Sequence, residues 1–124
     1  MKNFKLTLII GNTYRYEERA NNVVVNFWTC YIKLANQGED ISKYIKKVTF
    51  KLHETFPNPI IEVTKAPFKV SGRGWGYFNI PITIEWKDEL KMNKTKVNHM
   101  LAFYGEGDMQ TKEIEVDKTL LELQ

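Results

Sequence analysis

The chain has 124 residues, 43% of them hydrophobic, and its 18 Lys and Arg against 15 Asp and Glu give a net charge of +3. This composition excludes a disordered chain and predicts one globular domain spanning residues 1–124. The charge excess is too small for a protein that binds nucleic acid through phosphates, and no apolar run is long enough to span a membrane, so we expect neither partner.

The predicted secondary structure is almost entirely strand. Taken in chain order, the predicted strands cover residues 4–10, 28–34, 47–52, 60–65, 78–86, 97–103 and 111–116. Turn-forming residues separate them, notably at 36–38, 57–59, 71–74 and 105–108. Asp40 can cap one helical turn at residues 41–46, and the tail over residues 117–124 can begin a helix.

Apolar and polar residues alternate along three of these strands. One face carries Trp28, Cys30 and Ile32 in the second strand, and Ile80, Ile82, Ile84 and Trp86 in the fifth. Such alternation indicates antiparallel strands with one face on a core, so we predict an all-β, immunoglobulin-like antiparallel β-sandwich. Pro81 lacks a backbone donor, which places its strand at a sheet edge or beside a bulge.

The remaining charged residues and the single cysteine suggest no chemistry. Cys30 has no disulfide partner, which indicates a reducing compartment, and its apolar neighbours predict an inert thiol in the core. The two densest lysine groups, at residues 43–47 and 87–96, are interpreted as solvated lysines. The acidic pairs at residues 17–18 and 39–40 are interpreted as solvated surface.

Catalytic and metal-binding motifs fail on inspection. His53-Glu54 begins a zinc-protease motif, but position 57 is Pro rather than the second His. The glycines at 72, 74 and 76 are followed by a strand rather than the helix that a phosphate loop needs. We therefore expect no enzyme activity, no metal and no cofactor.

Two segments, residues 52–59 and 71–78, combine aromatic residues with glycines and small polar residues. Exposed aromatics on the loops of a rigid sandwich often form binding sites. Glycines on both sides of Trp75 allow a ligand to approach the backbone closely. The residues alone leave a second interpretation open, in which Phe56 and Trp75 simply cap the core.

These two segments resemble the signature of the YEATS family. The resemblance rests on Leu-His-Glu-Thr-Phe-Pro-Asn-Pro at 52–59, Pro-Phe-Lys-Val at 67–70 and Gly-Trp-Gly-Tyr-Phe at 74–78, and it extends over residues 6–104. The chain is most similar to short members of histone-acetyltransferase and chromatin-remodelling complexes. The resemblance implies a nuclear reader of acetyl-lysine, and of crotonyl-lysine, on histone tails.

The resemblance also implies roles for individual residues. Phe56 and Trp75 would be two walls around the acyl amide, and Phe78 the floor. The Trp75 N–H would donate to the acyl carbonyl. The site would be completed by a Thr55 hydroxyl that accepts from the amide N–H, by His53 at the entrance or supporting Thr55, and by Gly74 and Gly76, the latter leaving room for the acyl chain.

Two other functions remain open at this stage. Aromatic residues also form cages for methylated lysine through cation–π attraction. A sandwich that has lost its ligand can act as an interaction scaffold through an exposed strand edge. We further expect the lysine-rich segment at 87–96 to influence which residues flanking the modified lysine are preferred.

Overall fold

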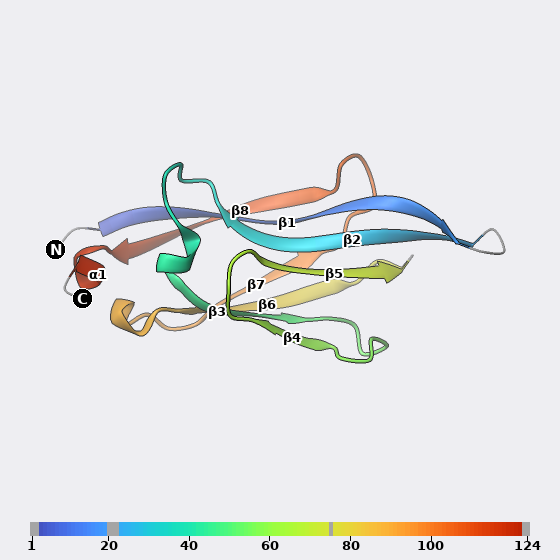
Figure 1. Ribbon diagram of the computed structural model, residues 1–124. Coiled ribbons are helices and arrows are strands. Elements are labelled where there is room, and N and C mark those ends of the chain that lie inside the picture. The colour runs from blue at the N-terminus through green and yellow to red at the C-terminus, as the bar shows by residue number, and fades with distance from the viewer. Residues whose placement is uncertain (1–2, 20–22, 75, 123–124) are drawn as a thin grey trace.

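The computed structural model, which describes residues 3–19, 23–74 and 76–122, consists of two antiparallel sheets packed face to face (Figure 1). The first sheet has the strand order β5-β2-β1-β8, with bounds Phe68–Gly74, Val23–Leu34, Asn3–Arg19 and Asp108–Asp117. The second has the order β4-β3-β6-β7, with bounds Ile60–Val63, Ile45–Lys51, Asn79–Trp86 and Thr95–Met100. The expected all-β, immunoglobulin-like sandwich is confirmed.

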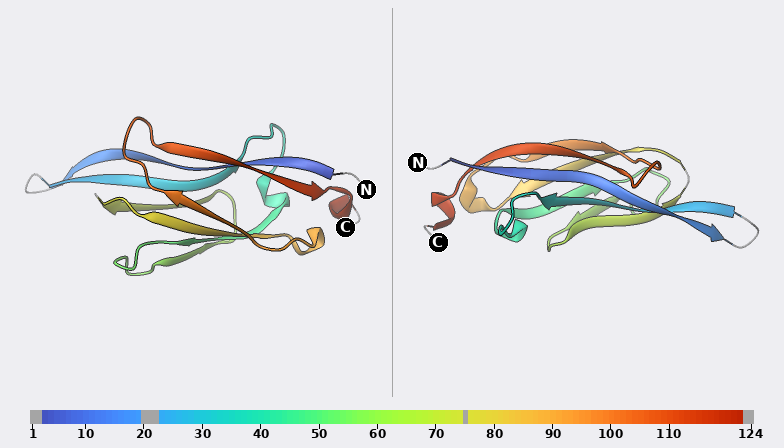
Figure 2. Two further views of the ribbon diagram at one scale, coloured as in Figure 1. Left: turned by 180° about the vertical axis from the view of Figure 1, so that it is seen from behind. Right: turned by 90° about the horizontal axis from the view of Figure 1, so that it is seen from above.

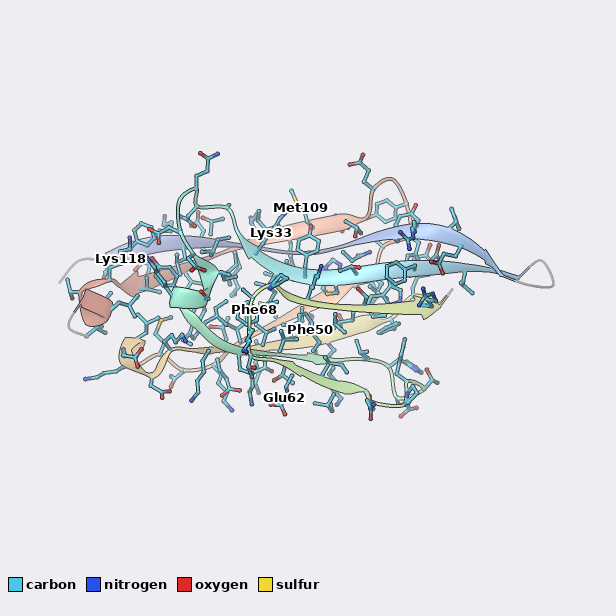
Figure 3. The ribbon with its side chains drawn as sticks, viewed as in Figure 1. Lys33, Phe50, Glu62, Phe68, Met109 and Lys118 are labelled. Carbon is cyan, nitrogen blue, oxygen red and sulfur yellow. The ribbon has the colours of Figure 1, made fainter. Side chains whose placement is uncertain are left out.

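The core lies between the two sheets, where the inward positions of each strand meet. In Figure 3, Phe50 of β3 and Phe68 of β5 point into this layer, while Lys33, Glu62 and Met109 lie on its outer sides. The predicted inward positions of the β2 and β6 strands are buried, with exposed fractions of 4% or less: Trp28, Cys30, Ile32, Ile80, Ile82, Ile84 and Trp86. Burial raises the pKa of the Cys30 thiol to about 12, which fits the predicted inert cysteine.

Residues 71–74 were expected to form a turn, and this prediction is wrong. They belong to β5, which pairs with β2 from Phe68 to Gly74. Gly72 faces the core directly over Trp28, where an added Cβ would stand 2.6 Å from the indole. A glycine here therefore serves close packing between neighbouring strands rather than a turn.

The strand expected to end at residue 10 continues far beyond it. Gly11 remains in the ladder because it has no side chain, since an added Cβ would stand 2.5 Å from the Asp108 carbonyl oxygen. Asn12 is buried, and its side chain bonds both backbone groups of Ala102, with Nδ2 donating at 2.9 Å and Oδ1 accepting at 3.0 Å. A polar residue thus fits inside the sandwich because its hydrogen bonds are satisfied.

The sequence predicted the strand of Pro81 at a sheet edge or beside a bulge. The β3–β6 ladder has a register shift between Ile45 and Lys47, but Pro81 does not lie on an edge strand. Its strand β6 is an inner strand between β3 and β7, and Pro81 pairs with Asn98. The Asn98 carbonyl accepts from the Gln110 side chain at 2.6 Å, so it points away from β6 and this pair is not hydrogen-bonded. The missing donor of Pro81 therefore faces the β3 side, where the ladder has already ended at Phe50–Ile82.

The short helices gather at the end of the sandwich that carries both termini (Figures 1 and 2). They are the 3₁₀ turns η2 (Ile41–Lys43) and η3 (Asp88–Leu90) and the helix α1 (Thr119–Glu122). Asp40 caps η2 as predicted, by accepting from the Ser42 N–H at 3.0 Å. None of the helices in the described part of the chain is long and apolar enough to cross a membrane.

Candidate functional site

The candidate site lies at the end of the sandwich opposite the termini, on the loop between β3 and β4 and the segment after β5. Its base is a cluster of aromatic rings centred on Phe78. The Phe78 ring lies 5.8 Å from Trp28, 5.7 Å from Phe56 and 5.9 Å from His53, measured between centroids. Because Trp28 is 1% exposed, the cluster is fixed to the core and gives the site a rigid apolar floor.

The loop at 53–58 is closed by its own hydrogen bonds. The Leu52 N–H donates to the Pro59 carbonyl at 2.7 Å, and the Phe56 N–H donates to the His53 carbonyl at 3.0 Å. These bonds set the position from which Phe56 packs edge-on against Trp28, with ring centroids 6.1 Å apart. Phe56 is therefore half-buried, with one side on the core and the other free for a ligand.

His53 fixes the direction of the Thr55 hydroxyl. The Thr55 N–H donates to His53 Nδ1 at 3.2 Å, so Nδ1 accepts and carries no proton. The Thr55 hydroxyl, 2.9 Å from the same nitrogen, must then donate its own proton to it. Its lone pairs are left to accept a hydrogen bond from a ligand.

A cavity of about 260 Å³ opens above the aromatic floor. Its walls are formed by His53, Thr55, Phe56, Arg73, Gly74, Gly76, Tyr77 and Phe78. A Cβ added at Gly74 or Gly76 would meet no atom within 4 Å, so these glycines leave the mouth of the cavity open. The size and apolar character suit a small side-chain group rather than a large cofactor.

The cavity walls carry one cation and no carboxylate among the described residues. The cation is Arg73, whose guanidinium donates to Glu17 at 2.7 Å and lies 4.8 Å from the centre of the Phe27 ring. These contacts hold the Arg73 charge on the outer face of β5. The cavity therefore offers nothing to neutralise an incoming ammonium group.

Six of the seven residues predicted for the site line this one cavity: His53, Thr55, Phe56, Gly74, Gly76 and Phe78. The seventh, Trp75, lies outside the described residues. Two lining residues, Arg73 and Tyr77, were not predicted as site residues. Tyr77 packs against Phe103, with ring centroids 5.0 Å apart. Its place in the sequence between the predicted site residues Gly76 and Phe78 could have indicated that it belongs to the site.

Asn26 is a further polar residue near the site that the sequence did not reveal. It is 7% exposed and pairs with Gly74 across β2 and β5. Its side-chain oxygen is the one buried side-chain polar atom without a hydrogen-bond partner within the described part of the chain. The predicted strand began at residue 28, so the alternation did not cover Asn26, which lies in the longer observed strand β2.

The lysine-rich segment at 87–96 does not lie near this cavity, so the structure gives no support to its expected influence on flanking residues. It connects the far end of β6 to β7, beside the termini (Figure 2). No group of three or more potential metal ligands occurs among the residues described. Cys30 is also unsuited to a catalytic pair, because its thiol is buried and has a raised pKa.

Comparisons with a family model and with curated proteins agree in relating this chain to one family. The model of the YEATS family matches residues 24–105. The chain is 37% identical over 115 residues to the Protein AF-9 homolog of Kluyveromyces lactis, covering 87% of this chain and 51% of the relative. It is 31% identical over 102 residues to the Transcription initiation factor TFIID subunit 14b of Arabidopsis thaliana, covering 82% of this chain and 38% of that protein.

Solved structures extend the similarity to nearly the whole chain. The Yaf9 YEATS domain bound to H3K27ac superposes with a TM-score of 0.82 at 28% identity, covering 99% of this chain and 96% of that one. The Yaf9 YEATS domain recognising an H3K122suc peptide gives a TM-score of 0.81 at 30% identity, with the same coverage. The chain spans about half the length of the curated relatives named above, or less.

Proposed function

Because the chain belongs to the YEATS family, a non-catalytic one, we propose that it reads acylated lysine on histone tails through the cavity at residues 53–78. The observation that carries this proposal is the set of six predicted residues around one apolar cavity with a directed Thr55 acceptor. The bound state of the Yaf9 domains supports the same ligand class.

The chemistry of an acylated lysine matches the cavity. Acylation replaces a hydrated ammonium with a planar neutral amide, which can be buried if its N–H and its carbonyl are both hydrogen-bonded. Thr55 Oγ1 would accept from the amide N–H, because its proton is already committed to His53. The carbonyl would accept from the Trp75 backbone N–H, a role taken from the family resemblance.

The side walls would sandwich the acyl group. Phe56 presents one ring face, and Trp75 would supply the other, since its two neighbours Gly74 and Gly76 both line the cavity. Phe78 would be the floor, and the open space over Gly76 would take the end of the acyl chain. A planar crotonyl chain would stack well in such a slot, at about 0.5–1.5 kcal/mol beyond its area burial.

Charge would select against unmodified lysine and methylated lysine. Both keep a positive charge, and the described walls contain Arg73 but no carboxylate to pair with it. A buried charge without a partner costs several kcal/mol. This observation favours the acyl-lysine reader over the methyl-lysine cage.

The partners would be acylated histone tails and the subunits of a chromatin-remodelling or histone-acetyltransferase complex. Similarity to a TFIID subunit and to the AF-9 homologs supports such a role in the nucleus.

Calorimetric titration with histone H3 tail peptides tests the proposal. We expect binding to acetylated and crotonylated peptides and at least tenfold weaker binding to the unmodified and trimethylated peptides. Trp75→Ala should abolish acyl-peptide binding, whereas Tyr16→Ala, at an exposed aromatic residue outside the cavity, should not change it. Equal affinity for all four peptides, or full affinity in Trp75→Ala, would refute the assignment.

A further inference from the structure

The two densest lysine groups of the sequence converge at the end of the sandwich opposite the candidate acyl-lysine cavity. Lys43 ends η2 and Lys87 follows β6, and the Lys87 N–H donates to the Tyr44 carbonyl at 2.8 Å. Lys118 approaches from the link between β8 and α1 and is labelled in Figure 3. The three lysines line a cavity of about 620 Å³, together with Glu39, Tyr44 and Leu121.

The one carboxylate among the described residues that line this cavity already has two partners. Glu39 accepts from Lys118 Nζ at 2.7 Å and from the Tyr44 hydroxyl at 2.5 Å. The ammonium of Lys118, followed by the Tyr44 hydroxyl, lowers the pKa of Glu39, so it stays ionised. The acidic pair at residues 39–40 was interpreted from the sequence as solvated surface, but the Glu39 side chain is only 18% exposed.

Lys43 and Lys87 form no close ion pair in the described part of the chain, although the Lys43 charge helps to lower the pKa of Glu39 and of Asp40. Neither makes an ion pair with a carboxylate of a described residue, whereas the neighbouring Lys46 pairs with Asp88 at 3.2 Å. Lys47 is likewise paired, with Glu62 and Glu85. The described lining residues therefore carry three ammonium groups against one carboxylate, which leaves the cavity with a net positive charge.

The remaining donors decide which anion would fit. The Tyr44 hydroxyl is used by Glu39, and the Ser42 hydroxyl donates to Asp40 at 2.7 Å. A phosphoryl group is usually held by several donors that converge on it. The two ammonium groups without an ion pair here belong to different elements, η2 and the segment after β6. Carboxylates spaced along a peptide need only one ammonium each, and Leu121 can pack against an apolar residue between them.

Nucleic acid is a poorer match for the same reason. Its phosphates bind a continuous run of unpaired basic residues. Such a run stops at Lys46, which pairs with Asp88 of η3, and at Lys47, which pairs with Glu62 of β4. We propose that this cavity is a second binding site, for an acidic peptide segment of a protein partner, with Lys43 and Lys87 as its charge partners.

Amide chemical-shift mapping of the whole chain tests this site, using a short peptide of the repeat Glu-Glu-Leu-Asp as the probe. We expect shifts concentrated at residues 38–44, 87 and 118–121, and none around the candidate acyl-lysine cavity. The same peptide with Gln and Asn in place of Glu and Asp should cause no shifts.

A pair of charge-reversal variants provides the control. Lys43→Glu combined with Lys87→Glu should lower the affinity for the acidic peptide roughly tenfold, because each exposed ion pair changes the affinity only a few-fold. Lys51→Glu combined with Lys96→Glu changes the net charge equally at exposed lysines outside the cavity and should leave binding unchanged.

Both double variants should keep wild-type thermal stability and acyl-peptide affinity. Because the acidic-peptide site lies at the opposite end from the acyl-lysine cavity, failure of the reader proposal would leave this proposal unaffected. Equal loss in the two variants would show diffuse attraction and overturn the proposal. So would the absence of any shifts, or a short DNA duplex that binds the same residues more tightly than the acidic peptide.

Discussion

Replacement of Thr55 by Val tests the proposed hydrogen bond at the site without disturbing the fold. The Thr55 side chain is exposed, and among the described residues its hydroxyl bonds only His53. Its removal should therefore change the free energy of unfolding by less than about 0.5 kcal/mol. The acyl amide N–H, however, would enter the cavity without an acceptor.

The cost of that unpaired donor sets the expected loss of affinity. Burying an amide N–H without a partner costs about 1–3 kcal/mol, which corresponds to a Kd raised roughly 5- to 150-fold. Calorimetry with an acetylated peptide measures the affinity, and thermal unfolding measures the stability. Thr55→Ser retains the hydroxyl and should stay within about threefold of the wild type. If Thr55→Val binds as tightly as the wild type, or Thr55→Ser loses as much, the role assigned to the hydroxyl is wrong.

Three further predictions concern the sandwich itself. Gly72→Ala should lower the free energy of unfolding in urea by about 1–3 kcal/mol, because the new Cβ would overlap the Trp28 indole, whereas Gly74→Ala, with open space above it, should change it little. Burial lowers the pKa of His99 below its usual 6.5, so the unfolded chain binds this proton more tightly, and the free energy of unfolding should fall as pH drops below about 6.5. His99→Gln should flatten that dependence between pH 5.5 and 7.5; an unchanged slope would assign it to other groups. Cys30, with a pKa raised to about 12, should react with a thiol reagent at pH 8 only after unfolding, and rapid modification of the native protein would contradict its burial.

Local pattern was sufficient to predict most of the sandwich. The alternation along β2, β3 and β6 is set by the geometry of a strand, in which successive side chains point to opposite faces. The inward positions of these strands could therefore be predicted without knowing their partners, and Trp28 and Phe50 are buried as expected. The core is in this sense determined by the sequence alone.

The candidate site was predicted from two short segments, and six of its residues meet around one cavity. The residue types alone left a core-capping role open, and the roles of these residues were assigned from the resemblance of the two segments to the family signature. The direction of the Thr55 hydroxyl could not, since it depends on the position of His53 in the closed loop. The unpaired Asn26 oxygen beside Gly74 was equally invisible.

Other features depended on which strands became neighbours. Gly72 was predicted in a turn, and Gly11 follows the predicted end of its strand. Each lies in a ladder where a neighbouring strand or ring occupies the space of a side chain. Pro81 can occupy the inner strand β6 because the pairing of β6 with β3 reaches Ile82 and does not include Pro81. Lys43 and Lys87 form one charged cavity although 44 positions separate them in the chain. A sequence pattern reports the surroundings of each residue along its own strand, whereas close packing and the pairing of charges are decided by atoms from distant segments, which only the tertiary structure brings together.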